Sequence, residues 1–132
     1  MKKKLTTEED YRLRVDRVCM YIREHLDKEI DMRRLAVLSA FSPFHFHRIM
    51  RAYLKEPIGA FIIRTRVETA AKLLRYTDLP VADIAYRVGY DTPSSLTKSF
   101  CKLFGISPKM YRLTKNYQMM TTREPKAEVK LS

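Results

Sequence analysis

The sequence predicts an all-α fold of seven helices, in which two helix-turn-helix subdomains are joined by a long linker helix. Only three glycines occur in 132 residues, and no stretch alternates apolar and polar side chains for long enough to suggest a β-hairpin. Apolar residues recur instead at the three- and four-residue spacings of amphipathic helices. A pattern of short helix, tight turn and second helix occurs twice, about 50 residues apart.

Four helices are expected in the first part of the chain. An amphipathic pattern indicates the first helix over about 10–27. Asp31 can cap a short second helix, because its carboxylate can accept from the exposed amides of the first turn. Ser42-Pro43 begins the third helix, with serine as N-cap and proline at the first helical position. A fourth helix over 57–76 would be a rod about 28 Å long.

Three further helices follow a break at Thr77-Asp78-Leu79-Pro80. We expect a short helix from Val81 to Gly89, a helix that begins at Thr92-Pro93, and a last short helix capped by Ser107-Pro108. The predicted organisation is a flexible lead-in over 1–10, an N-terminal helix-turn-helix subdomain over 11–56, the linker helix over 57–76, a C-terminal helix-turn-helix subdomain over 77–115, and a tail over 116–132 that is disordered or the stub of a following domain.

An internal repeat supports this division. Leu35-Ala36 matches Ile84-Ala85 at an offset of 49 residues, and from the match of Phe46 with Leu96 onwards the offset is 50. One residue is therefore inserted in the second turn, and each copy follows the helix-turn-helix plan.

The charge distribution indicates a polyanionic partner. The formal net charge is +11, and residues 31–116 hold fifteen bases and six acids, so nine of the excess charges fall in the repeated region. Nucleic acid or an anionic membrane surface is the expected class of partner. No apolar run approaches the ~20 residues needed to span a bilayer. Two cysteines with neither zinc-finger spacing nor a disulfide pattern fit a cytoplasmic protein.

The second helix of each copy carries the candidate binding residues, because in a helix-turn-helix this helix enters the major groove of DNA. No acidic residue occurs between Phe44 and Lys55, or between Thr92 and Met110. The side chains expected to face inward are Phe46, Ile49, Met50 and Tyr53 in the first copy and Leu96, Ser99, Phe100 and Leu103 in the second. The side chains expected to face DNA are Phe44, His47, Arg48 and Arg51 in the first copy and Ser94, Ser95, Thr97, Lys98 and Lys102 in the second.

Individual residues allow other interpretations. Phe44 could contact thymine methyls or sugars, or pack against the turn as a surface aromatic. His45 and His47 diverge by about 200° on a helix, so they do not form a shared metal-ligand face. His45 is expected to pack or to brace the turn. We expect no catalytic residue, metal or cofactor, since the sequence contains no paired carboxylates, metal cluster or activated thiol.

Several short motifs over about 12–114 form one recognisable set: Leu35-Ala36, Ser42-Pro43 with Phe46-His47-Arg48, Arg66 with Ala70 and Leu73, Ile84-Ala85 with Val88-Gly89-Tyr90, Ser95-Leu96, Phe100, Phe104-Gly105-Ile106-Ser107-Pro108 and Tyr111-Arg112. With these motifs the chain resembles the DNA-binding domain of the AraC/XylS family of bacterial transcription regulators. The resemblance implies a sequence-specific regulator that inserts two recognition helices into successive major grooves of double-stranded DNA, as a monomer, and acts with RNA polymerase in the cytoplasm, in association with the nucleoid.

The resemblance leaves three questions open. The chain is either a stand-alone regulator or a DNA-binding fragment followed by an effector domain, and the run Phe44-His45-Phe46-His47-Arg48 resembles members with a GyrI-like effector domain. A protein-interaction module that contacts the transcription machinery is the alternative function. Lys55 stands where the family usually has a left-handed glycine, so it either costs about 1 kcal/mol or shifts the helix end by a residue.

Overall fold

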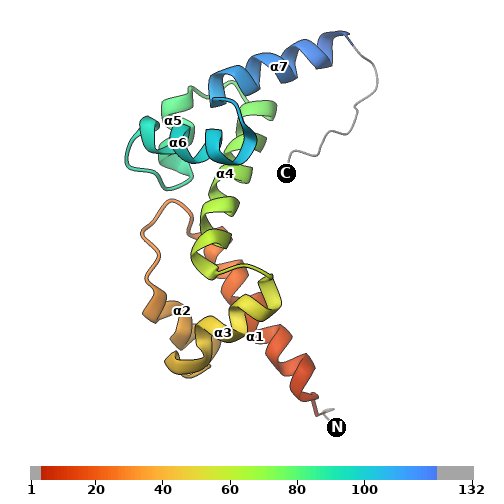
Figure 1. Ribbon diagram of the computed structural model, residues 1–132, viewed down its shortest axis with the longest axis vertical. Coiled ribbons are helices and arrows are strands. Elements are labelled where there is room, and N and C mark those ends of the chain that lie inside the picture. Colours follow the sequence, from red (N-terminus) through yellow and green to blue (C-terminus); the bar gives the residue numbers. More distant parts are fainter. Residues whose placement is uncertain (1–3, 122–132) are drawn as a thin grey trace. The chain divides into compact units, whose positions relative to one another are not determined.

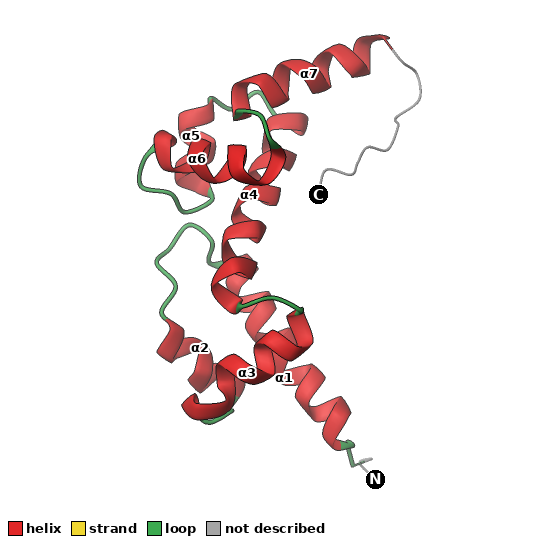
Figure 2. Cartoon of the chain, viewed as in Figure 1, coloured by secondary structure: helices red, strands yellow, loops and turns green. Residues whose placement is uncertain are grey.

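The computed structural model describes the backbone of residues 4–121 and the side chains of residues 4–114. Helices and connecting loops, without strands, make up the described residues (Figures 1 and 2), which confirms the predicted all-α fold. The helices are α1 (Thr7–Glu24), α2 (Met32–Ser39), α3 (Pro43–Leu54), α4 (Ile58–Tyr76), α5 (Val81–Arg87), α6 (Pro93–Phe104) and α7 (Pro108–Thr121). None of these helices is long and apolar enough to cross a membrane.

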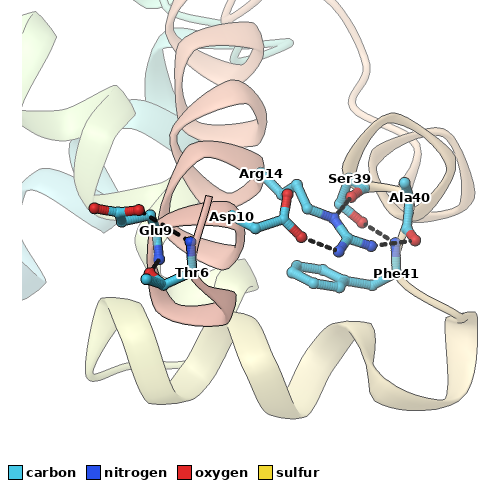
Figure 3. Close-up of polar contacts among 7 residues, drawn as sticks. All are labelled: Thr6, Glu9, Asp10, Arg14, Ser39, Ala40 and Phe41. Carbon is cyan, nitrogen blue, oxygen red and sulfur yellow. Dashed lines mark hydrogen bonds and ion pairs between the residues drawn. The ribbon is translucent and has the colours of Figure 1, made fainter. Parts of the chain in front are cut away.

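The first helix begins earlier than predicted, inside the segment expected to be a flexible lead-in. Thr6 and Glu9 form a capping box, in which each backbone amide donates to the other side chain at 3.0 Å (Figure 3). Glu8 and Asp10 place further negative charge in the first turn, where the helix dipole favours it. The lead-in prediction was therefore wrong for residues 7–10, although the Thr-x-x-Glu signal was present in the sequence.

The last helix is longer than predicted. α7 continues to Thr121, whereas a disordered tail or stub was expected from residue 116. Residues 116–121 contain neither glycine nor proline, and glutamine and methionine are good helix formers, so nothing local ends the helix at Lys115. The rest of the predicted tail, over 122–132, lies outside the described residues.

The chain forms two compact units, Met1–Ile62 and Ile63–Ser132, and the boundary falls inside α4. Ile58, Phe61 and Ile62 of α4 belong to the hydrophobic core of unit 1. Val67 and Leu74, farther along the same helix, belong to the core of unit 2. The segment expected to be a separate linker is therefore divided between the two cores, because apolar residues occur along its whole length.

The internal repeat is longer than the sequence comparison indicated, since it includes a helix before each helix-turn-helix. Residues of α1 and α4 are related by an offset of 52. The loop after α1, residues 25–31, is three residues longer than the loop after α4, residues 77–80, so the offset falls from 52 to 49 between these helices and the helices that follow them. The equivalent core positions, at a constant offset of 52, are Val15 and Val67, Val18 and Ala70, Cys19 and Ala71, and Ile22 and Leu74.

Arg112 fixes the start of α7 within unit 2. Its Nε donates to the Leu74 carbonyl at 3.1 Å, Nη1 to that of Leu79 at 2.8 Å, and Nη2 to that of Thr77 at 3.0 Å. These carbonyls lie at and after the end of α4, where backbone oxygens lack partners within the helix. One guanidinium thus holds both the end of α4 and the loop that leads to α5.

Candidate nucleic-acid interface

Helices α3 and α6 begin in the same way. Ser42 Oγ accepts from the His45 amide at 3.3 Å, and Thr92 Oγ1 accepts from the Ser95 amide at 3.1 Å. Proline follows each cap at the first helical position, as predicted. The caps fix the residue at which each helix begins, and so determine which side chains face away from the core.

The face of α3 matches the prediction. Phe46 and Met50 are buried in the core of unit 1, and Ile49 and Tyr53 pack partly against it. Phe44 is 88% exposed, a large value for an aromatic side chain. The other predicted DNA-facing side chains of this helix, His47, Arg48 and Arg51, are also exposed.

The face of α6 matches the prediction less completely. Ser94, Ser95, Lys98 and Lys102 are exposed, whereas Thr97 is half-buried. Leu103 was expected to face inward and is 37% exposed, so that prediction was wrong. Phe104 packs in its place. The centre of its ring lies 4.6 Å from the centre of the Phe100 ring and 5.5 Å from the centre of the Tyr111 ring.

The repeat shows which candidate residues are equivalent. Phe44 corresponds to Ser94, His47 to Thr97 and Arg48 to Lys98 at an offset of 50 residues. Arg51 corresponds to Cys101, and Lys102 to Ala52, so these two candidate cations occupy different positions on their helices.

The side chains three residues after each cap bind the cap itself. Ser42 Oγ lies 3.0 Å from His45 Nδ1, and Thr92 Oγ1 donates to Ser95 Oγ at 3.1 Å. His45 therefore braces the turn, as expected. Ser95, its equivalent, was predicted to contact DNA, and its hydroxyl is engaged with the cap in the structure.

Two arginines of α2 add positive charge to unit 1 and were missed by sequence reasoning. Arg33 and Arg34 are exposed in the first turn, directly after the Asp31 cap, whose carboxylate accepts from the Arg33 amide at 3.0 Å. The equivalent residues of α5, at an offset of 49, are Ala82 and Asp83. The first helix of a helix-turn-helix crosses the DNA backbone, so this pair was a recognisable signal.

The helix ends around α3 adopt a conformation that favours glycine. Ala40, after α2, has φ 63°, and Lys55, after α3, has φ 66°. The equivalent residues of unit 2 are Gly89, with φ 100°, and Gly105, with φ 81°. Lys55 therefore accepts the left-handed conformation, and the predicted alternative of a shifted helix end is wrong.

The described residues contain no group of three or more histidine, cysteine or acidic side chains that could hold a metal ion. Both cysteines are free thiols. Burial raises the pKa of the Cys19 thiol, which keeps it neutral and poorly nucleophilic. Cys19 thus behaves as a small core residue.

The fold and these two exposed faces define a helix-turn-helix protein with two units of one plan. A family model described as "Helix-turn-helix domain" matches residues 35–114. The transcriptional activator AarP of Providencia stuartii is 33% identical over 113 residues, which cover 85% of this chain and 84% of AarP. The F1 operon positive regulatory protein of Yersinia pestis is 35% identical over 100 residues, covering 75% of this chain and 33% of that protein.

A solved structure agrees with these relatives. The DNA-binding domain of AdpA, a global transcriptional factor determined in complex with a target DNA, matches with a TM-score of 0.76 and 28% identity, over 82% of this chain and 97% of that domain. The chain belongs to the AraC/XylS family of DNA-binding transcription regulators. It spans most of AarP but only 33% of the length of the F1 operon regulator.

Proposed function

We propose that this chain regulates transcription by binding a specific sequence in double-stranded DNA, with α3 and α6 in successive major grooves. The observation that carries the proposal is the pair of equivalent capped helices, each of which exposes a face without acidic residues. The AdpA domain, which shares this fold, was determined on a target DNA. Two recognition helices in one chain remove the need for a dimer, so we expect a monomer on DNA.

The candidate residues divide into two kinds of contact. Phe44, His47 and Arg48 on α3, and Ser94, Thr97 and Lys98 on α6, lie near the start of a recognition helix, the part that contacts base edges. Arg48 can donate two hydrogen bonds to a guanine, a contact that discriminates against the wrong base by roughly 1–3 kcal/mol. Phosphate contacts are assigned to the remaining exposed polar and cationic residues, Arg51, Ser95, Lys102, Arg33 and Arg34.

The two helices differ in their capacity for reading bases. Phe44, His47 and Arg48 offer an apolar ring and strong donors, whereas Ser94, Thr97 and Lys98 offer short hydroxyls and a point charge. We therefore expect sharper base preference in the half-site bound by α3 than in the half-site bound by α6.

Positive regulation is the expected outcome of binding. AarP is a transcriptional activator and the F1 operon protein a positive regulator. We propose that the chain acts with RNA polymerase, associated with the nucleoid in the cytoplasm, and that it works by binding rather than by catalysis.

Selection of bound sequences from random duplexes tests the proposal. The wild-type protein should enrich a two-part motif with parts about one helical turn, roughly 34 Å, apart. Arg48→Ala should flatten the preference at one position and weaken binding of the best duplex about 5- to 150-fold. Lys102→Ala should weaken all sequences alike and reduce the dependence of affinity on salt.

Arg17→Ala is the matched control, since Arg17 is an exposed arginine of α1, outside both helix-turn-helix pairs. It should leave the motif unchanged. Failure of the wild-type protein to enrich any motif would favour the protein-interaction module instead. An unchanged motif for Arg48→Ala would contradict the assignment of Arg48.

A further inference from the structure

Arg14 of α1 binds the turn that connects α2 to α3. Its Nε donates to the Ser39 carbonyl at 2.8 Å and its Nη2 to the Ala40 carbonyl at 2.6 Å. Its Nη1 forms an ion pair with Asp10 at 3.0 Å, one helical turn earlier. Figure 3 shows the guanidinium between the Asp10 carboxylate and the backbone of the turn. The Arg14 side chain is only 20% exposed.

Two backbone oxygens of the turn, those of Ser39 and Ala40, accept hydrogen bonds from Arg14. Carbonyls at the end of a helix lack partners within the helix, and Arg14 supplies donors to two of them. The guanidinium also lies 4.2 Å from the centre of the Phe41 ring. Ser39 Oγ completes the arrangement, since it accepts from the Phe41 amide at 3.0 Å and donates to the Ala36 carbonyl at 2.7 Å.

The position of the turn determines the direction of α3. Ala40 has a left-handed backbone, and Ser42, the N-cap of α3, follows two residues later. Arg48 lies six residues beyond that cap, about 9 Å along the helix axis. A tilt of about 10° at the cap would displace Arg48 by about 1.5 Å, which exceeds the tolerance of a hydrogen bond to a base.

The repeat places an arginine at the corresponding position of the second unit. Arg14 and Arg66 are related by the same offset of 52 residues that relates the core positions of α1 and α4. An arginine on the helix before the helix-turn-helix is therefore a feature of both units.

We propose that Arg14 is a positioning residue, which orients the recognition helix α3 through the Ser39–Ala40 carbonyls without contacting DNA. The proposal rests on the proposed function, since it concerns the half-site that α3 reads. Lysine keeps the charge of arginine but lacks its planar fork of donors, so Arg14→Lys removes the geometry and keeps the charge.

Sequence selection with Arg14→Lys tests the proposal. The base preference in the α3 half-site should weaken, with affinity for the best duplex reduced about 5- to 150-fold, while the α6 half-site is unchanged. The affinity for a random duplex should stay within about twofold of the wild-type value, and its dependence on salt should be unchanged, because no phosphate contact is lost. Asp10→Asn is a milder change to the same network, since it removes the charge that pairs with Arg14. It should also weaken the base preference in the α3 half-site, by a smaller factor.

Two further variants separate positioning from stability. Arg112→Lys removes another arginine that binds three carbonyls, all of them in unit 2, and should leave the α3 half-site unchanged. Ala40→Gly relieves the left-handed strain of the same turn. Added to Arg14→Lys, it should raise the melting temperature of that variant and leave its base preference weakened.

The outcomes are distinguishable. Recovery of the wild-type motif by the double variant of Arg14→Lys and Ala40→Gly would overturn the proposal, since Arg14 would then act through stability alone. An unchanged motif for Arg14→Lys would also overturn it. A wild-type protein that enriches no motif would instead refute the proposed function.

Discussion

Replacing Lys55 with glycine should stabilise unit 1. Lys55 is exposed and has φ 66°, a conformation that costs an L-residue about 1–2 kcal/mol. Glycine avoids this cost but loses about 0.5–1 kcal/mol more conformational entropy on folding. The central values of these two ranges give a net gain in the free energy of unfolding of about 0.75 kcal/mol.

The equivalent residue of unit 2 provides the reverse experiment. Gly105 has φ 81°, and a Cβ built on it meets no atom within 4 Å. Gly105→Ala should therefore destabilise unit 2 through backbone strain alone, by about the amount that unit 1 gains from Lys55→Gly. Equal and opposite effects would show that the same conformation is costly in both units.

Native-state hydrogen exchange is the appropriate measurement, because it reports the free energy of opening of each unit separately. Lys55→Ala is the control, since it removes the same charge but keeps a Cβ, and it should leave the stability nearly unchanged. A gain from Lys55→Ala equal to that from Lys55→Gly would attribute the effect to charge. No gain from Lys55→Gly would refute the assumption that this helix end is strained.

Two further predictions concern unit 2. The buried hydroxyl of Tyr90 has no hydrogen-bond partner among the described residues, so Tyr90→Phe should raise the free energy of unfolding of unit 2 by about 1 kcal/mol, measured by the same hydrogen exchange. Transplanting the α3 face onto α6, by Ser94→Phe, Thr97→His and Lys98→Arg together, should make both halves of the selected motif alike. A second half-site that keeps its wild-type sequence would contradict the equivalence of these positions.

The capped starts of four helices were the most predictable local features of this fold. Asp31, Ser42, Thr92 and Ser107 each accept a backbone amide of the helix that they were predicted to begin. A cap is a local interaction between a side chain and amides two or three residues later, so its signal lies within a short window of sequence. The Thr6 cap is equally local, since Thr6 and Glu9 are three residues apart.

Long-range features could not be predicted in the same way. The bonds from Arg14 to the turn join residues 25 and 26 positions apart, and nothing near Arg14 in the sequence indicates its partners. The equivalence of α1 with α4 was also missed, because most of the equivalent core positions, such as Cys19 and Ala71, share apolar character but not identity. Such matches become visible when burial defines which positions to compare.

The α2–α3 pair of unit 1 combines exposed arginines with strained turns. Left-handed residues other than glycine, Ala40 and Lys55, stand at the two turns that flank α3, whereas unit 2 has glycine at both equivalent positions. Unit 1 also carries Arg33 and Arg34 where unit 2 has Ala82 and Asp83. A strained turn persists only when its surroundings hold it. The hydrogen bond from Arg14 to the Ala40 carbonyl therefore does two things: it satisfies a carbonyl at the end of α2, and it holds the left-handed Ala40 in place. Unit 1 thus combines the stronger proposed donors for DNA with a recognition helix whose preceding turn is held from outside the helix-turn-helix.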